Sequence, residues 1–182
     1  MKKNSIRLIA LIGVMTAISF ILYYFEIPFW LAPYLKIDFS DVPAILISLS
    51  VGPIAGITIE LFKNILHFLF ISKDAVPLIG EFANFSAGVS FLLPVALLAR
   101  KNFNLKTYVP ALALGTALMA AIMIPINYFI TIPLYFPDMG NATKLTVIFT
   151  AITPFNIVKG IMISVIIALL YPRLKTVLKR IA

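Results

Sequence analysis

Two polar residues lie near the middle of the strongly apolar stretch 145–171. Asn156 and Lys159 are three positions apart, which places them on one face of a helix. A lysine at the centre of a membrane helix costs about 2.5–3.5 kcal/mol on insertion scales, and such residues usually face the bundle interior and serve a function. A lone Asn often only joins two helices, but the Asn–Lys pair indicates a site for a polar ligand.

Two further amides, Asn84 and Asn127, stand in other apolar stretches. At 1.5 Å per residue they lie roughly 8–10 Å from the same end of their helices, with Asn156 and Lys159 somewhat deeper. We therefore expect three amides and one ammonium to converge inside the bundle. Each amide offers a donor and an acceptor, which suits a flat heteroaromatic ligand with alternating donors and acceptors and suits a bare ion poorly.

A second polar stripe consists of Glu60, Lys63, Asn64 and His67, which follow helical spacing. Glu60 and Lys63 can neutralise each other, and an internal ion pair that stabilises the bundle is at least as well supported here as a ligand site. His67 is the only histidine, and we expect a satisfied polar residue rather than a catalytic base.

The composition places these residues in a lipid bilayer. Of the 182 residues, 62% are hydrophobic and 12% are charged, with a mean hydropathy of +1.05. Soluble domains average about 45–50% apolar and about 25% charged residues, so a soluble enzyme, a disordered tail and a disulfide scaffold are excluded. The chain has no cysteine, which also excludes disulfides and cysteine-bound metals.

The sequence lacks the common catalytic motifs. It contains no G-x-x-x-x-G-K-[ST] phosphate loop and no G-x-S-x-G nucleophile motif. No His, Asp or Glu cluster has metal-ligand spacing. We expect no catalytic residue, no metal site and no enzyme activity.

The fold class predicted is an all-α membrane protein, a six-transmembrane-helix bundle forming one domain over residues 1–182. The uncharged run 8–25 is about long enough to span a bilayer and has no signal-peptide cleavage site after it, so it is interpreted as a retained first helix. The second segment is too short to cross alone and is expected to tilt or to meet the third at Gly52-Pro53. The predicted helices are 6–25, 42–51, 53–71, 77–99, 108–132 and 145–171.

The charge distribution predicts the orientation. With six crossings, one side carries ten cations and no acid, whereas the opposite side carries three lysines and six acids. Because cytoplasmic loops hold the Lys/Arg excess, both termini are predicted to be cytoplasmic, and the net charge of +8 is interpreted as a topology signal rather than as nucleic-acid binding. The ten cations are Lys2, Lys3, Arg7, Arg100, Lys101, Lys106, Arg173, Lys175, Lys179 and Arg180.

Several segments together resemble the substrate-binding S components of energy-coupling factor (ECF) transporters, and specifically the riboflavin-binding members. The resemblance covers nearly the whole chain, and the segments occur in the family's order. The combination is specific, although no single segment is. The segments are YLKIDFSDVP at 34–43, GPIAG at 52–56, ELFKN at 60–64, FANF at 82–85, NYF at 127–129 and PFNIVKG at 154–160.

The resemblance implies a substrate site open to the outside and capped by the first loop. By this likeness Asn127, Asn156 and Lys159 would hydrogen-bond the isoalloxazine ring of riboflavin, and Asn84 would help at the pocket. Tyr34 and Phe39 would cover the ligand, although the position of Tyr34 near a helix end is equally typical of an interfacial aromatic belt. Riboflavin would be the transported substrate, with no separate cofactor.

The resemblance also implies partners in the cell membrane: a transmembrane T component and two ATPase subunits. Family members meet the T component through an A-x-x-x-A motif on the first helix. Ala10, Gly13 and Ala17 form a similar small-residue face, with Gly13 in place of one Ala. From the residues alone, such a face serves packing within the chain as readily as docking of a partner.

Three alternatives stay open at this point. The same fold could bind another flat vitamin or nucleobase-like compound. A small intramembrane enzyme using Glu60 or His67 would need a nucleophile or metal that the sequence does not provide. A purely structural membrane subunit would not need Lys159 in mid-helix.

Overall fold

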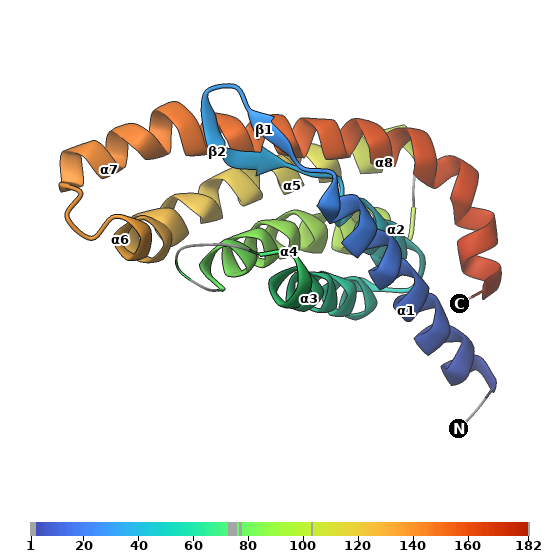
Figure 1. Ribbon diagram of the computed structural model, residues 1–182. Coiled ribbons are helices and arrows are strands. Elements are labelled where there is room, and N and C mark those ends of the chain that lie inside the picture. Colours follow the sequence, from blue (N-terminus) through green and yellow to red (C-terminus); the bar gives the residue numbers. More distant parts are fainter. Residues whose placement is uncertain (1–2, 73–75, 77, 103, 182) are drawn as a thin grey trace.

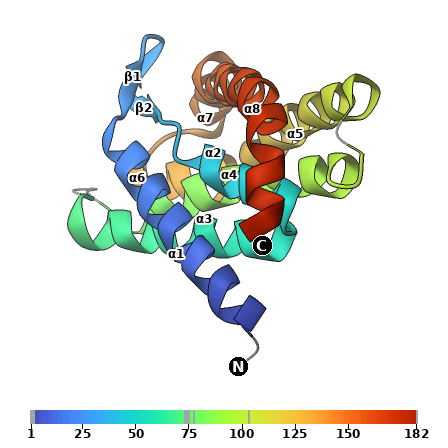
Figure 2. The same cartoon turned by 90° about the vertical axis from the view of Figure 1, so that its right-hand side faces the viewer.

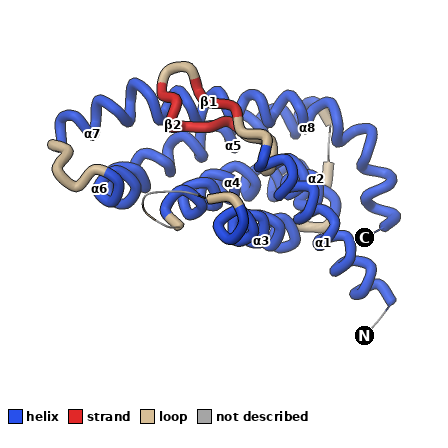
Figure 3. Tube along the Cα trace, in the orientation of Figure 1, coloured by secondary structure: helices blue, strands red, loops and turns tan. Residues whose placement is uncertain are grey.

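The computed structural model describes residues 3–72, 76, 78–102 and 104–181 and shows a bundle of long helices with one small hairpin (Figures 1 and 3). Within these residues, five helical stretches are long and apolar enough to cross a membrane, and a sixth apolar helix, α2, is short. The predicted six-helix membrane bundle is confirmed. The first four helices are α1 (Lys3–Tyr24), α2 (Asp41–Ser50), α3 (Pro53–Phe70) and α4 (Ile79–Ala99).

The last two spans are longer than predicted, because each is built from consecutive helical pieces. One span comprises α5 (Leu105–Ile126), the π-helical turn η1 (Asn127–Thr131) and α6 (Ile132–Tyr135). The other comprises α7 (Asn141–Val147), η2 (Ile148–Ile152) and α8 (Thr153–Ile181). Proline cannot donate its helical hydrogen bond, and each π-helical turn lies within a few residues of a proline, Pro125 or Pro154.

The last helix was predicted to end at residue 171, and that boundary is wrong. Pro172 lies inside α8, which continues to Ile181 and bends near its C-terminal end (Figure 1). Leu178 is buried in the main hydrophobic core, so packing against the bundle keeps this segment helical. The predicted start of the fourth helix, Pro77, and the loop residues Lys73 and Asp74 lie outside the described residues.

The first loop contains a two-stranded antiparallel hairpin that the sequence did not predict. Strands β1 (Ile27–Phe29) and β2 (Ala32–Ile37) pair with Ile27 opposite Ile37. Phe29 is fully buried and packs in one cluster with Ala151, and its ring lies 5.5 Å from that of Phe155. The hairpin is therefore fixed against the η2–α8 span rather than free above the bundle (Figure 1).

Helix α2 lies at the centre of the bundle, among α1, α3, α4 and α8 (Figure 2). Its carboxyl end meets α3 at Gly52, whose φ of 152° is a backbone conformation that favours glycine. Arg100 donates a hydrogen bond to the Val51 carbonyl, and the Tyr171 hydroxyl donates to the Leu49 carbonyl at 3.0 Å. Side chains from two other elements thus satisfy carbonyls that the end of a helix leaves unpaired.

The two ends of the chain lie at the same end of the bundle (Figure 1), as an even number of crossings requires. The hairpin and the α6–α7 connection lie toward the opposite end. The cytoplasmic placement of the termini stays a prediction.

Candidate ligand-binding cavity

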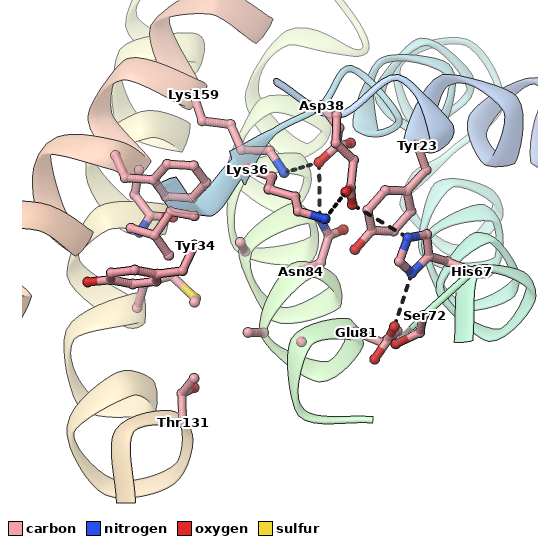
Figure 4. A pocket seen from close by; sticks show the side chains of 18 of the residues that line it. Tyr23, Tyr34, Lys36, Asp38, His67, Ser72, Glu81, Asn84, Thr131 and Lys159 are labelled. Carbon is pink, nitrogen blue, oxygen red and sulfur yellow. Dashed lines mark hydrogen bonds and ion pairs between the residues drawn. The ribbon is translucent and has the colours of Figure 1, made fainter. Parts of the chain in front are cut away.

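A cavity of about 720 Å³ lies between the hairpin and the helices, and Figure 4 shows many of its side chains. Its walls come from α1, β2, α3, α4, the α5–α6 span and the η2–α8 span. A largely apolar cavity of this size with a few placed polar groups is typical of a small-molecule site.

Five of the six ligand-site residues predicted from the sequence line this cavity. Asn84, Asn127, Asn156, Lys159 and Tyr34 reach it from α4, η1, α8 and β2. The predicted convergence of three amides and one ammonium is therefore present in the fold. Phe39 is not among the lining residues and packs instead against the main hydrophobic core.

The amides are oriented by hydrogen bonds within their own helices. The Asn127 side-chain nitrogen donates to the Met123 carbonyl at 2.7 Å, and that of Asn156 donates to the Ile152 carbonyl at 2.8 Å. Each nitrogen retains a second N–H. The Asn156 side-chain oxygen is buried and has no hydrogen-bond partner among the described residues, so this amide still offers both a donor and an acceptor.

Lys159 is buried, with 2% of its surface exposed, and is held by two carboxylates that follow strand β2. Its Nζ lies 3.1 Å from Oδ2 of Asp38 and 3.1 Å from Oδ2 of Asp41. A buried ammonium is tolerated when it is paired and hydrogen-bonded. Of these contacts, the one with Asp38 is a hydrogen bond and the one with Asp41 is an ion pair, so at least one of the three N–H donors of Lys159 remains for a ligand.

The lysine belongs to a larger buried ionic network. Lys63 forms ion pairs with Asp41 and, at 2.8 Å, with Glu60, and it donates to the Ser40 hydroxyl at 2.8 Å. The predicted Glu60–Lys63 pair is confirmed. Asp41 bridges the two lysines and thereby joins the cavity to the interface of α2 and α3.

Asp38 is a cavity residue that the sequence analysis missed. It accepts hydrogen bonds from Ser40, from Lys159 and, at 3.3 Å, from the Asn84 side chain. Burial raises the pKa of Asp38, but the ammonium groups of Lys159 and Lys63 and the hydrogen bonds from Ser40 outweigh it and lower the pKa to about 2. The sequence did contain one indication of such a residue, because each buried lysine needs an acidic partner.

Tyr34 lines the rim of the cavity from β2 and is 61% exposed. Its ring faces the cavity in Figure 4. The position fits a cover over a ligand and an interfacial aromatic residue equally well.

The polar stripe of α3 is buried, as predicted, but its members differ in their surroundings. Asn64 bonds the Glu60 carbonyl at 2.8 Å. His67 instead reaches the cavity, where its Nδ1 lies 3.0 Å from Glu81 and its Nε2 lies 3.5 Å from Glu26. Burial raises the pKa of Glu26, but hydrogen bonds with His67 and Lys36 outweigh it and lower the pKa below its ordinary value.

The small-residue face of α1 packs against nothing within the described chain. Ala10, Gly13 and Ala17 are exposed, and a Cβ added at Gly13 would have no atom within 4 Å. The sequence left two roles open for this face, packing within the chain and docking of a partner. The fold does not use the face for packing within the chain.

The fold and the cavity together define a multi-pass integral membrane protein with an internal site for a small molecule. The sequence model of the family "ECF transporter, substrate-specific component" matches residues 7–171. The chain belongs to this family and is the substrate-specific component of an ECF-type transporter in the plasma membrane.

Several characterised proteins are similar over the full length. "Riboflavin transporter RibU" of Staphylococcus aureus (strain TCH60) is 44% identical over 188 residues, covering 100% of this chain and 96% of that protein. "Riboflavin transporter FmnP" of Bacillus subtilis (strain 168) is 38% identical, covering 93% of each chain. A solved structure of the S component of a bacterial ECF transporter superposes with a TM-score of 0.82 at 40% identity, covering 98% of this chain and 100% of that one.

Proposed function

We propose that this chain binds riboflavin from the outer face of the membrane and delivers it to the transport machinery. The observation that carries the proposal is the meeting of three amides and one ammonium, from three different spans of the bundle, in one cavity. Relatives at 44% and 38% identity are named riboflavin transporters, which supports riboflavin over another flat vitamin.

In this proposal the polar edge of the isoalloxazine ring faces Asn127, Asn156 and Lys159. The amides supply one free N–H and one carbonyl oxygen each, and the ammonium supplies its remaining N–H to a ring oxygen or nitrogen. Asn84 and Tyr34 stand close to the ring, and Phe39 acts indirectly by fixing the loop. Burial of the ring against apolar walls supplies most of the affinity.

The chain, residues 1–182 as one binding domain, would act without an ATP site or catalytic residues of its own. Energy would come from two ATPase subunits through a T component that docks on the α1 face of Ala10, Gly13 and Ala17. Both termini would be cytoplasmic. Riboflavin would be substrate and not cofactor, and the protein would not be an enzyme.

The test is the visible absorption spectrum of protein purified in detergent from riboflavin-containing medium. We expect flavin bands that remain through gel filtration, and saturable quenching of flavin fluorescence when ligand-free protein is titrated. Asn156→Ala removes a buried hydrogen-bonding partner, worth about 1–3 kcal/mol, and should weaken binding by about tenfold or more. Colourless protein that does not bind added riboflavin would contradict the proposal.

A further inference from the structure

The last turns of α8 form a segment that the proposed function leaves without a role. It comprises residues 172–181, and we call it the end segment. It begins at Pro172, which lacks the N–H that a helix uses at this position and therefore bends the helix. Seen from the end of the bundle that carries both termini, the end segment crosses the bundle beside α2 rather than running along the bundle axis (Figure 2).

The two faces of the end segment differ in what they contact. Leu178 is buried in the main hydrophobic core together with Tyr171, and Leu174 packs against the same core. These three positions follow helical spacing and share one face. Arg173 and Lys175 are exposed. The bundle thus covers the apolar face and leaves the two cations at the surface.

The position of Arg173 along the chain places the end segment at the surface of the bilayer. No charged residue lies between Lys159 and Arg173. Arg7, Arg100 and Lys106 likewise border the charge-free runs of three other spans at this end of the bundle. Cations at the ends of membrane helices lie in the headgroup layer, because the hydrocarbon layer disfavours charge. The end segment therefore lies among the lipid headgroups.

The chain itself supplies no acidic partner for the cations of the end segment. The sequence has no Asp or Glu in residues 1–25, 82–137 or 139–182. The ion pairs among the described residues all belong to the cavity or to the ionic network beside it, and none of them involves Arg173 or Lys175. The positive charge of this face is therefore available to anions outside the chain.

We propose that the end segment binds the phosphodiester headgroups of anionic phospholipids. The guanidinium of Arg173 presents paired N–H donors that match two oxygens of one phosphate, and the ammonium of Lys175 adds a second positive charge. Each Lys or Arg near an anionic lipid surface strengthens binding by about fivefold. With the proposed orientation these lipids belong to the cytoplasmic leaflet, and in other respects the inference is independent of the proposed function.

A lipid bound here would hold the end segment against α2. The hydroxyl of Tyr171, the residue before the bend, donates a hydrogen bond to the Leu49 carbonyl at 3.0 Å, so this part of α8 covers the carboxyl end of α2. A ligand that binds only the folded arrangement stabilises it by mass action. We therefore expect anionic lipid to raise the unfolding temperature of the protein.

The test uses full-length protein purified in detergent, to which phosphatidylglycerol or phosphatidylcholine with the same acyl chains is added. Phosphatidylglycerol should raise the unfolding temperature saturably, and phosphatidylcholine and inorganic phosphate should raise it much less. Arg173→Gln and Lys175→Gln should each increase the phosphatidylglycerol concentration for half of the effect by about fivefold. Without lipid, both variants should unfold at the wild-type temperature, because both side chains are exposed.

Lys144→Gln is the matched control. It removes one cation from α7, at the opposite end of the bundle, and should leave the response to phosphatidylglycerol unchanged. Detergent-solubilised protein has no fixed orientation, so an altered lipid response cannot result from altered membrane insertion.

Three results would overturn the proposal. The first is equal stabilisation of the wild type by phosphatidylglycerol and phosphatidylcholine. The second is a wild-type response to phosphatidylglycerol in both Arg173→Gln and Lys175→Gln, which would mean that these cations only direct topology. The third is loss of riboflavin uptake in cells by variants that keep the wild-type lipid response, which would assign the end segment to a protein partner.

Discussion

Lys159 has two tasks at once, because its ammonium balances Asp38 and Asp41 while one N–H remains for the cavity. Removing this charge leaves both carboxylates short of a partner in a buried site. Breaking a buried ion pair on one side costs about 3–5 kcal/mol. Lys159→Met should therefore lower the unfolding temperature of ligand-free protein as well as its flavin affinity, whereas Lys101→Met, at an exposed position, should change neither. If Lys159→Met lost flavin affinity but kept its unfolding temperature, Lys159 would not be needed to balance the two carboxylates.

Asp38 gives the ionic network a defined dependence on pH. Its pKa is about 2 in the folded chain, below the ordinary value of about 3.9. The folded state therefore gains stability from the ionised carboxylate above about pH 4, and that gain is lost as the pH falls toward 2. The difference in unfolding temperature between wild type and Asp38→Asn should be constant from about pH 5 to 7 and shrink below about pH 4. A difference that grows on acidification would contradict this assignment.

At the scale of elements, we expect the β1–β2 hairpin to control access to the cavity, because β2 lines the cavity and Phe29 fixes the buried side of the hairpin. This ring is fully buried and contacts Phe155 beside the amide of Asn156. Phe29→Ala removes a large apolar contact, worth about 3–5 kcal/mol in a core, so the hairpin should open more often. Stopped-flow displacement should show riboflavin dissociating roughly tenfold faster or more. Leu31→Ala, at the exposed tip of the hairpin, should leave the rate unchanged.

The α2–α3 junction depends on a backbone conformation that only glycine adopts without strain. Gly52 has a φ of 152°, and a Cβ there would lie 3.3 Å from the Arg100 guanidinium. Gly52→Ala should lower stability by about 1–3 kcal/mol, measured by thermal unfolding. Gly13→Ala is the matched control, because Gly13 lies within a helix with open space around it. Alanine there should be neutral or stabilising by up to about 1 kcal/mol.

The sequence predicted those parts of the structure that depend on local pattern. The apolar spans could be predicted from their length and hydropathy. The polar residues of the cavity could be predicted because polar groups are costly in lipid, which drew attention to Asn156 and Lys159. The partner of Lys159 could not be found this way, since Asp38 is 121 positions away. The hairpin was missed for a similar reason, because its strands are short and Phe29 is buried by residues of the last span.

At the scale of the whole molecule, we expect substrate binding and energy coupling to use separate surfaces. The cavity lies between the hairpin and the helices, whereas Ala10, Gly13 and Ala17 form an exposed face on the outside of α1 with no packing partner in the described chain. Small residues on a membrane helix allow another helix to approach closely. A large side chain on this face should therefore interfere with a partner and not with the ligand.

Gly13→Leu tests this separation. Because nothing lies within 4 Å of a Cβ at Gly13, the leucine should be accommodated in the isolated protein, with riboflavin affinity within about twofold of wild type and an unchanged unfolding temperature. In cells that depend on this transporter, the same variant should lose most riboflavin uptake, because the added side chain keeps the partner helix away. Val14→Leu, on the same helix and exposed to lipid, keeps an aliphatic surface and should leave uptake unchanged. If Gly13→Leu supports normal uptake, the docking surface lies elsewhere on the bundle; if it abolishes riboflavin binding as well, the two surfaces are not independent.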